Sequence, residues 1–148
     1  MRLKSTVVIG AVLGCLSFSS AFAQEEPQSA RQAQMKVVGQ SMKELGAIAK
    51  GEKPYDGAAV KAALEGVSTS MKAFPDQFPA GTETGMETEA APAIWEKTDD
   101  FRAKSDKLAA EADTLLASVP ADQAGVGAAM KALGATCGDC HETYRLKR

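Results

Sequence analysis

Residues 126–144, with the sequence VGAAMKALGATCGDCHETY, decide how this chain folds. Their apolar and cysteine side chains recur at steps of four, three, four, three and four residues, the spacing that lines one face of an α-helix. The members of this stripe are Val126, Met130, Leu133, Cys137, Cys140 and Tyr144. The stretch therefore predicts an amphipathic helix, beginning after Asp122, that carries two cysteines on its apolar face.

Cys137, Cys140 and His141 form the pattern C-x-x-C-H within this helix. Two sulfurs at this spacing can each form a thioether bond with a haem vinyl group, and the histidine that follows can ligate the iron. We therefore expect one covalent haem c, held through Cys137 and Cys140 with His141 on the iron. A redox dithiol or disulfide and a zinc site are the alternatives, although a thioredoxin-like dithiol belongs in a βαβ unit and structural zinc takes four ligands.

The first 23 residues have the organisation of a secretory signal peptide. Two basic residues precede the apolar run 7–18, and residues 21–23 provide a small-x-small cleavage site. Because haem c is attached outside the bacterial cytoplasm, we expect export to the periplasm with cleavage after Ala23. A transmembrane helix is disfavoured because the apolar run is short and rich in serine. Cys15 leaves a lipid-anchored N-terminus as a second alternative.

Length, composition and charge limit the class of protein to which the mature chain, residues 24–148, can belong. This length suits one domain with a single core. Aromatic residues make up 5% of the sequence and alanines are frequent, which favours helices packed on small side chains over a sheet. The formal net charge of −2 becomes −4 without Arg2 and Lys4, so nucleic acid is not an expected partner. We expect an all-α domain with no membrane segment in the mature form.

Three further stretches have helical periodicity. The first spans about residues 28–50, the second runs from the capping residue Asp56 to Phe74, and the third spans residues 92–119. Their apolar stripes are Met35, Val38, Met42, Leu45 and Ala49; Val60, Leu64, Val67, Met71 and Phe74; and Ile94, Phe101, Leu108, Ala112, Leu115 and Val119. Four such helices predict an antiparallel four-helix bundle with the haem near one end of its core. The non-periodic segment 75–91 is expected to border the haem.

These features resemble the class II c-type cytochromes, the family of cytochrome c′ and its low-spin, methionine-ligated relatives. Besides C-x-x-C-H, the resemblance rests on Arg31-Gln32, Met35-Lys36, Gly51-Glu52-Lys53-Pro54-Tyr55-Asp56, Phe78-Pro79-Ala80-Gly81-Thr82, Ile94-Trp95 and Tyr144-Arg145. It implies that Met35 faces the iron opposite the histidine and that Arg31 meets a haem propionate. The spacing is compatible, because residues four apart share one helical face. Core filling by Met35 and a solvated Arg31 are the structural alternatives.

The resemblance implies further residues around the haem. Gln32, Thr82 and Glu83 match positions along the haem edge. Arg145 matches a basic residue near the histidine side. Trp95, a large aromatic residue at a bundle seam, is expected to pack beside the ring. Each of these residues also has an ordinary role available, as a solvated loop residue, a core aromatic side chain or a cation at a helix C-terminus.

Two functions are possible, and they differ in which residues ligate the iron. The chain has one histidine, already assigned to the iron, and no other catalytic arrangement, so we do not expect an enzyme. If Met35 also ligates, a His/Met site suits single-electron transfer between periplasmic redox partner proteins. If Met35 stands off, a five-coordinate iron suits binding of nitric oxide or carbon monoxide. Residues 46–56 resemble the methionine-ligated members, whereas Arg31-Gln32 and residues 78–82 resemble cytochrome c′. On balance we expect electron transfer.

Two further expectations concern assembly and a different class of protein. Resemblance to cytochrome c′ implies that a homodimer through the first two helices is an open alternative to a monomer. A structural or metal-carrying helical bundle with an unmodified dithiol is the third functional alternative.

Overall fold

The computed structural model describes residues 26–147, so the predicted signal peptide, residues 1–23, lies outside the described part. Apart from one isolated antiparallel bridge, the described residues form helices and connections. The helices are α1 (Pro27–Ala49), α2 (Gly57–Ala73), the 3-10 helix η1 (Phe74–Gln77), α3 (Ala93–Glu96), α4 (Thr98–Ala117) and α5 (Gln123–Tyr144). No helix among residues 26–147 has the length and apolar character needed to cross a membrane. The predicted all-α fold is confirmed.

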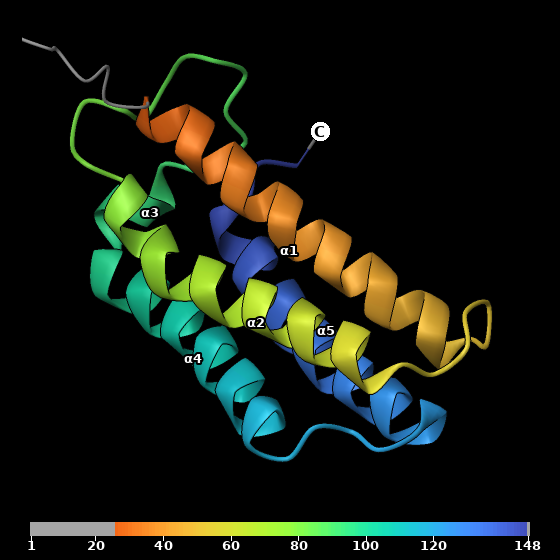
Figure 1. Cartoon of the computed structure of the whole chain (residues 1–148). Helices are drawn as coiled ribbons and strands as arrows, with labels where there is room; N and C mark the ends of the chain where they lie inside the picture. The colour runs from red at the N-terminus through yellow and green to blue at the C-terminus, as the bar shows by residue number, and fades with distance from the viewer. Residues whose placement is uncertain (1–25, 148) are drawn as a thin grey trace, which may run out of the picture.

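The four long helices form an antiparallel bundle (Figure 1). α1 packs against α2 and α5, and α4 packs against the same two helices. Both short connections, residues 50–56 and 118–122, lie at one end of the bundle. Residues 78–92 and the last described residues lie at the other end. The predicted four-helix bundle is therefore confirmed, and the long segment covers one of its two ends.

Local chemistry fixes the helix ends where the short connections lie. Asp56 Oδ1 accepts a hydrogen bond from the amide of Ala58 (2.8 Å), and Asp122 Oδ1 accepts one from the amide of Gly125 (2.8 Å). These carboxylates satisfy amides that the first turn of a helix leaves without a partner. Gly51, which follows the C-cap residue Lys50 of α1, adopts φ +73°, a left-handed conformation that ends a helix and that glycine takes without a Cβ clash. The helix starts predicted after Asp56 and Asp122 are confirmed.

The predicted apolar stripes meet in one core. Its fully buried large side chains are Leu45, Ile48, Leu64, Leu133, Val60, Val67 and Val126. Burying each such side chain stabilises the fold by about 1.5–3 kcal/mol. The core also takes in buried alanines of α4 and α5, Ala109, Ala112 and Ala129. Small side chains at these contacts let the helices approach closely.

The third predicted helix is interrupted. The sequence predicted one continuous helix, but Lys97 adopts φ −132° and ψ 50° between α3 and α4. Thr98 Oγ1 donates a hydrogen bond to the carbonyl of Ile94 (3.3 Å), which satisfies an acceptor at the end of α3. Asp99 and Asp100 lie in the first turn of α4, where acidic side chains favour a new N-terminus. The prediction of a continuous helix is therefore wrong at Lys97, and α3 packs on both α4 and α5.

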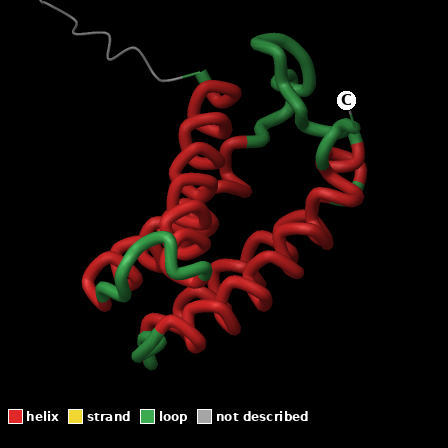
Figure 2. The backbone as a smooth tube through the Cα atoms, turned by 90° about the vertical axis from the view of Figure 1, so that its right-hand side faces the viewer, coloured by secondary structure: helices red, strands yellow, loops and turns green. Residues whose placement is uncertain are grey.

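The segment between α2 and α3 covers the open end of the bundle (Figure 2). Its beginning continues α2 as the 3-10 turn η1, which contains Pro75. Its end is tied to the end of α5: the amide of Ala91 donates to the carbonyl of Tyr144 (3.1 Å), and the amide of Leu146 donates to the carbonyl of Glu89 (2.8 Å). These two bonds hold the segment against the helix that carries C-x-x-C-H.

Candidate haem site

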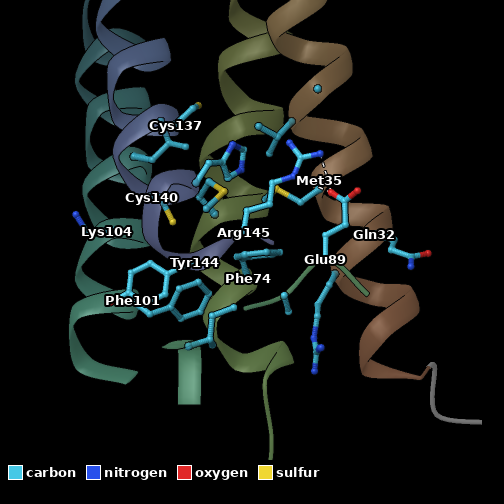
Figure 3. Close-up of a pocket in the computed structure, with 18 of the residues that line it drawn as sticks. Gln32, Met35, Phe74, Glu89, Phe101, Lys104, Cys137, Cys140, Tyr144 and Arg145 are labelled. Atoms are coloured by element: carbon cyan, nitrogen blue, oxygen red, sulfur yellow. Dashed lines mark hydrogen bonds and ion pairs between the residues drawn. The ribbon is translucent and has the colours of Figure 1, made fainter. Parts of the chain in front are cut away.

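A cavity of about 850 Å³ lies between the four long helices at the end covered by residues 78–92. Its volume falls within the roughly 300–1,000 Å³ typical of ligand and cofactor sites. Met35 lines it from α1, and Cys137 and Cys140 line it from α5, on opposite sides (Figure 3). Residues 87–90 of the covering segment also line it, so the prediction that this segment borders the site is supported.

α5 presents the three motif residues along one wall of the cavity. Cys137 and Cys140 are half-buried free thiols, and His141 lines the same wall. Burial raises the pKa of Cys137, and raises the pKa of Cys140 to about 11, so both stay protonated at neutral pH. Partial burial, followed by the positive charge of Arg145, lowers the pKa of His141. This favours the neutral imidazole, the form that ligates a metal.

Two interactions with α4 hold the motif in place. Thr136, which precedes the first cysteine, is buried and its Oγ1 donates to the carboxylate of Glu111 (2.8 Å to Oε2). Asp139, between the cysteines, accepts a hydrogen bond from Lys104 Nζ (2.6 Å), which lowers the pKa of that carboxyl. An exposed ion pair adds little stability. The pair therefore links α5 to α4 beside the motif and contributes little to stability.

α1 provides the opposite wall, with Met35 half-buried at the cavity surface. The register of α1 against α5 follows from two contacts. Gln123 Nε2 donates to the carbonyl of Ala49 (3.2 Å), and a Cβ added at Gly46 would lie 3.6 Å from the side chain of Met130. Because the two helices run antiparallel, counting back along α1 and forward by the same number of residues along α5 brings Met35 level with residues 137–141. Met35 and the motif therefore face each other across the cavity.

Arg31 lies on the cavity wall but its guanidinium is bound to the covering segment. Its exposed fraction is 5%. Nε donates to the carbonyl of Gln77 (2.6 Å), Nη1 to the carbonyl of Thr82 (3.0 Å) and Nη2 to the hydroxyl of Thr82. The guanidinium carbon lies 4.2 Å from the ring centre of Phe78 and 5.4 Å from that of Trp95. The predicted contact with a haem propionate stays a prediction beside these loop contacts.

The other residues implied by the resemblance divide into two groups. Gln32 and Arg145 line the cavity, whereas Thr82, Glu83 and Trp95 are not part of its wall. The hydroxyl of Thr82 donates to a loop carbonyl, and Glu83 accepts a hydrogen bond from a loop amide. Trp95 belongs to an aromatic cluster behind the wall. The roles suggested for all five along the haem stay predictions.

Arg145 is paired with a residue that the sequence did not single out. Arg145 Nε lies 2.7 Å, and Nη2 lies 2.6 Å, from Glu89 Oε2 (Figure 3). The pair adjoins the antiparallel bridge between Ala90 and Arg145. It therefore reinforces the link between the covering segment and the end of α5, on the rim of the cavity.

Tyr144 is a second residue whose setting the sequence left open. It follows Cys140 by one helical turn, is buried and lines the cavity. Its hydroxyl donates to Asp100 Oδ2 (2.5 Å). Its ring packs edge-on against Phe101, with ring centres 5.3 Å apart. Burial, reinforced by the bond to Asp100, raises the pKa of Tyr144 to about 12, so the phenol stays protonated.

The donor set around the cavity fits a covalently attached haem. Two free thiols and a neutral imidazole line one wall, a thioether lines the other, and apolar side chains from all four long helices lie between them. Thioether formation at the cysteines, with nitrogen and sulfur donors available to the iron, is the chemistry of c-type cytochromes. Fold and site together define a c-type cytochrome built on a four-helix bundle.

Comparison with known proteins identifies the family. Residues 26–145 match the sequence profile of the cytochrome c′ family. A relative named cytochrome c-556, from Agrobacterium fabrum, is 56% identical over 148 residues, which cover 100% of this chain and 99% of the relative. The chain therefore belongs to the cytochrome c′ family of class II c-type cytochromes, and membership implies a covalently attached haem c.

Solved structures agree with this assignment. Cytochrome c′ from Rhodopseudomonas palustris superimposes with a TM-score of 0.79 at 33% identity, over 84% of this chain and 99% of that one. Oxidised cytochrome c556 from the same organism superimposes with a TM-score of 0.75 at 36% identity, over 84% and 99%. The two likenesses are nearly equal, so they identify the fold and the family without separating the two kinds of cytochrome.

Proposed function

We propose that this protein is a periplasmic single-electron carrier whose haem iron is ligated by His141 and Met35. The observation that carries the proposal is that Met35 lines the cavity wall opposite the motif and level with it. Met42 also lines the cavity, but the same register puts it near residues 130–134, about two turns away. Of the two cavity-lining methionines on α1, Met35 is therefore the one that lies level with the motif.

The residues around the site have definite tasks in such a carrier. Cys137 and Cys140 hold the haem, which supplies the redox couple, so that the group cannot dissociate. His141 supplies nitrogen and Met35 supplies sulfur, a pair that raises the reduction potential of a haem. Val38 and Met42 add apolar surface beside Met35, which keeps water from the site and raises the potential further.

A five-coordinate, gas-binding haem protein is the second candidate function. Gly39 also lines the cavity, four residues after Met35, and a Cβ added there would meet no other atom within 4 Å. The absence of a side chain at Gly39, one turn from Met35, leaves room for a small neutral ligand such as nitric oxide or carbon monoxide if the thioether stands away from the iron. The structure is about equally similar to a cytochrome c′ and to a cytochrome c556, so this similarity is compatible with the gas-binding function as well.

Visible absorption of the mature holoprotein tests the choice. We expect a low-spin spectrum, with a sulfur-to-iron charge-transfer band in the oxidised form. The Met35→Ala variant should become high-spin and bind carbon monoxide, whereas Met42→Ala, which removes another cavity thioether, should keep the low-spin spectrum. A wild-type spectrum that is high-spin and shifts with carbon monoxide would favour the gas-binding function. A low-spin Met35→Ala spectrum would exclude its sulfur as ligand.

Export and assembly complete the proposal. Cleavage after Ala23 and release to the periplasm accord with the pattern of residues 1–23. A homodimer through α1 and α2 stays a prediction from the resemblance. The side chain of Val37 on α1 is 42% exposed, so α1 has apolar surface that a second copy of the chain could cover. Sedimentation of the mature protein at neutral pH distinguishes a dimer from a monomer.

A further inference from the structure

The two tyrosines of the chain lie in opposite settings. Tyr144 has an exposed fraction of 3% and lines the cavity one turn after Cys140. Tyr55 is 41% exposed in the connection between α1 and α2, at the other end of the bundle, where its hydroxyl donates to the carbonyl of Pro120 (2.8 Å). A readily oxidised phenol therefore lies beside the haem position, and a second one, far from it, serves as an internal reference.

Asp100 gives the phenol of Tyr144 a proton acceptor. The hydroxyl donates to Asp100 Oδ2 at 2.5 Å, a short charge-assisted hydrogen bond. Asp100 itself is exposed in the first turn of α4, so a proton that it accepts can pass to water. A phenol gives up an electron far more readily when its proton can leave at the same time, because this avoids a cationic product.

Aromatic packing shields the ring of Tyr144 and connects it to a cluster. Its ring centre lies 5.3 Å from that of Phe101, which lies 4.8 Å from that of Phe78, and Trp95 follows at 5.7 Å. Phenylalanine is not readily oxidised, so Phe101 acts as packing against the tyrosine. A radical formed at Tyr144 would be protected from solution and from other tyrosines.

We propose that Tyr144 and Asp100 form a redox-active pair that removes an oxidising equivalent from the haem when a hydroperoxide reacts there. Cleavage of the O–O bond of hydrogen peroxide would release one water, leave the second oxygen with the haem and take two electrons, one of which the haem would supply. The other electron comes from Tyr144, whose proton passes to the carboxylate of Asp100. The products are a neutral tyrosyl radical and a protonated Asp100, which releases its proton to water. The pair thereby protects the porphyrin from oxidation.

This inference rests on the attached haem of the proposed function, and it applies to molecules in which the sulfur of Met35 is not bound to the iron. The experiment therefore uses Met35→Ala holoprotein, in which the thioether cannot block the peroxide. Samples mixed rapidly with hydrogen peroxide are frozen and examined by electron paramagnetic resonance, and ring-deuterated tyrosine identifies a tyrosyl signal. The same background carries Tyr144→Phe, Asp100→Asn or, as the matched control, Tyr55→Phe. Circular dichroism and the haem spectrum before mixing verify that each variant is folded.

We expect the tyrosyl signal in the parent and in the Tyr55→Phe variant, and its loss in Tyr144→Phe. Asp100→Asn keeps the size of the side chain but removes the proton acceptor, so the signal should be lost there too. Haem bleaching by peroxide should be faster in both signal-free variants. A signal that survives Tyr144→Phe, or a parent without any tyrosyl signal, would overturn the proposal. If Tyr144→Phe fails to fold, a full signal in Asp100→Asn would overturn it equally.

Discussion

Replacing Arg31 by lysine tests how the end of the bundle is closed. Lysine keeps the positive charge but has no planar fork, so it cannot reproduce the three bonds to Gln77 and Thr82 or the stacking on Phe78. The ammonium group of a lysine in this position would hydrogen-bond to at most one of the three oxygen acceptors of Arg31. The residues after η1 should then lose their main attachment to α1.

The expected cost follows from the bonds that are lost. A hydrogen bond to a charged group contributes about 1.5–3 kcal/mol, and two such bonds disappear in the Arg31→Lys variant. Because the lysine relaxes toward a remaining carbonyl, we expect the free energy of unfolding to fall by about 3 kcal/mol. For a domain of this size this corresponds to a decrease in Tm of roughly 10 °C.

Urea denaturation of the mature holoprotein measures the loss, and Arg102→Lys is the matched control. Arg102 makes one exposed bond, to Asp76 (2.9 Å), so its replacement should change the free energy of unfolding by less than about 0.5 kcal/mol. Amide hydrogen exchange of residues 79–88 should accelerate only in Arg31→Lys. Equal stability of the two variants would refute this reasoning. A shifted reduction potential with unchanged stability would assign Arg31 to a propionate instead.

Two further predictions concern the helix that carries the motif. Asp122→Ala removes the N-cap of α5, so the free energy of unfolding measured in urea should fall by about 1 kcal/mol. The control Asp106→Ala, at an exposed position inside α4, should change the free energy of unfolding little. Equal effects of the two substitutions would contradict the capping role of Asp122. Burial raises the pKa of Tyr144 from 10.0 to about 12, so its contribution to stability is complete below pH 10 and is lost as the pH rises toward 12. The Tm of the wild type should therefore fall more steeply between pH 10 and pH 12 than the Tm of Tyr144→Phe. Parallel curves of Tm against pH would contradict this contribution of Tyr144.

Features set by neighbouring residues were predictable from the sequence. The caps at Asp56 and Asp122 were predictable because a carboxylate at a helix start acts on amides two or three residues away. The break at Lys97 was missed because Ile94 and Phe101 are seven residues apart, which is compatible with an unbroken helix. Thr98 and the two aspartates after it were the local signal for a second start.

In the site, too, local features were predictable from the sequence and contacts between distant residues were not. Spacing alone puts Cys137 and Cys140 on the apolar face of α5, and the structure has both on the cavity wall. The contacts of Arg31 with Thr82, of Arg145 with Glu89 and of Tyr144 with Asp100 join residues 51, 56 and 44 positions apart. Such pairs depend on how the helices pack, so no local pattern predicts them.

The mass of the mature protein, isolated intact from the producing bacterium, tests the central claim most directly. The account predicts the polypeptide 24–148 plus one haem, and the loss of that added mass in a variant with both Cys137→Ser and Cys140→Ser. Because the polypeptide and the added group contribute separately, the same spectrum reports where the signal peptide is cleaved. A wild-type mass equal to the bare polypeptide would contradict covalent haem attachment and the functions proposed from it.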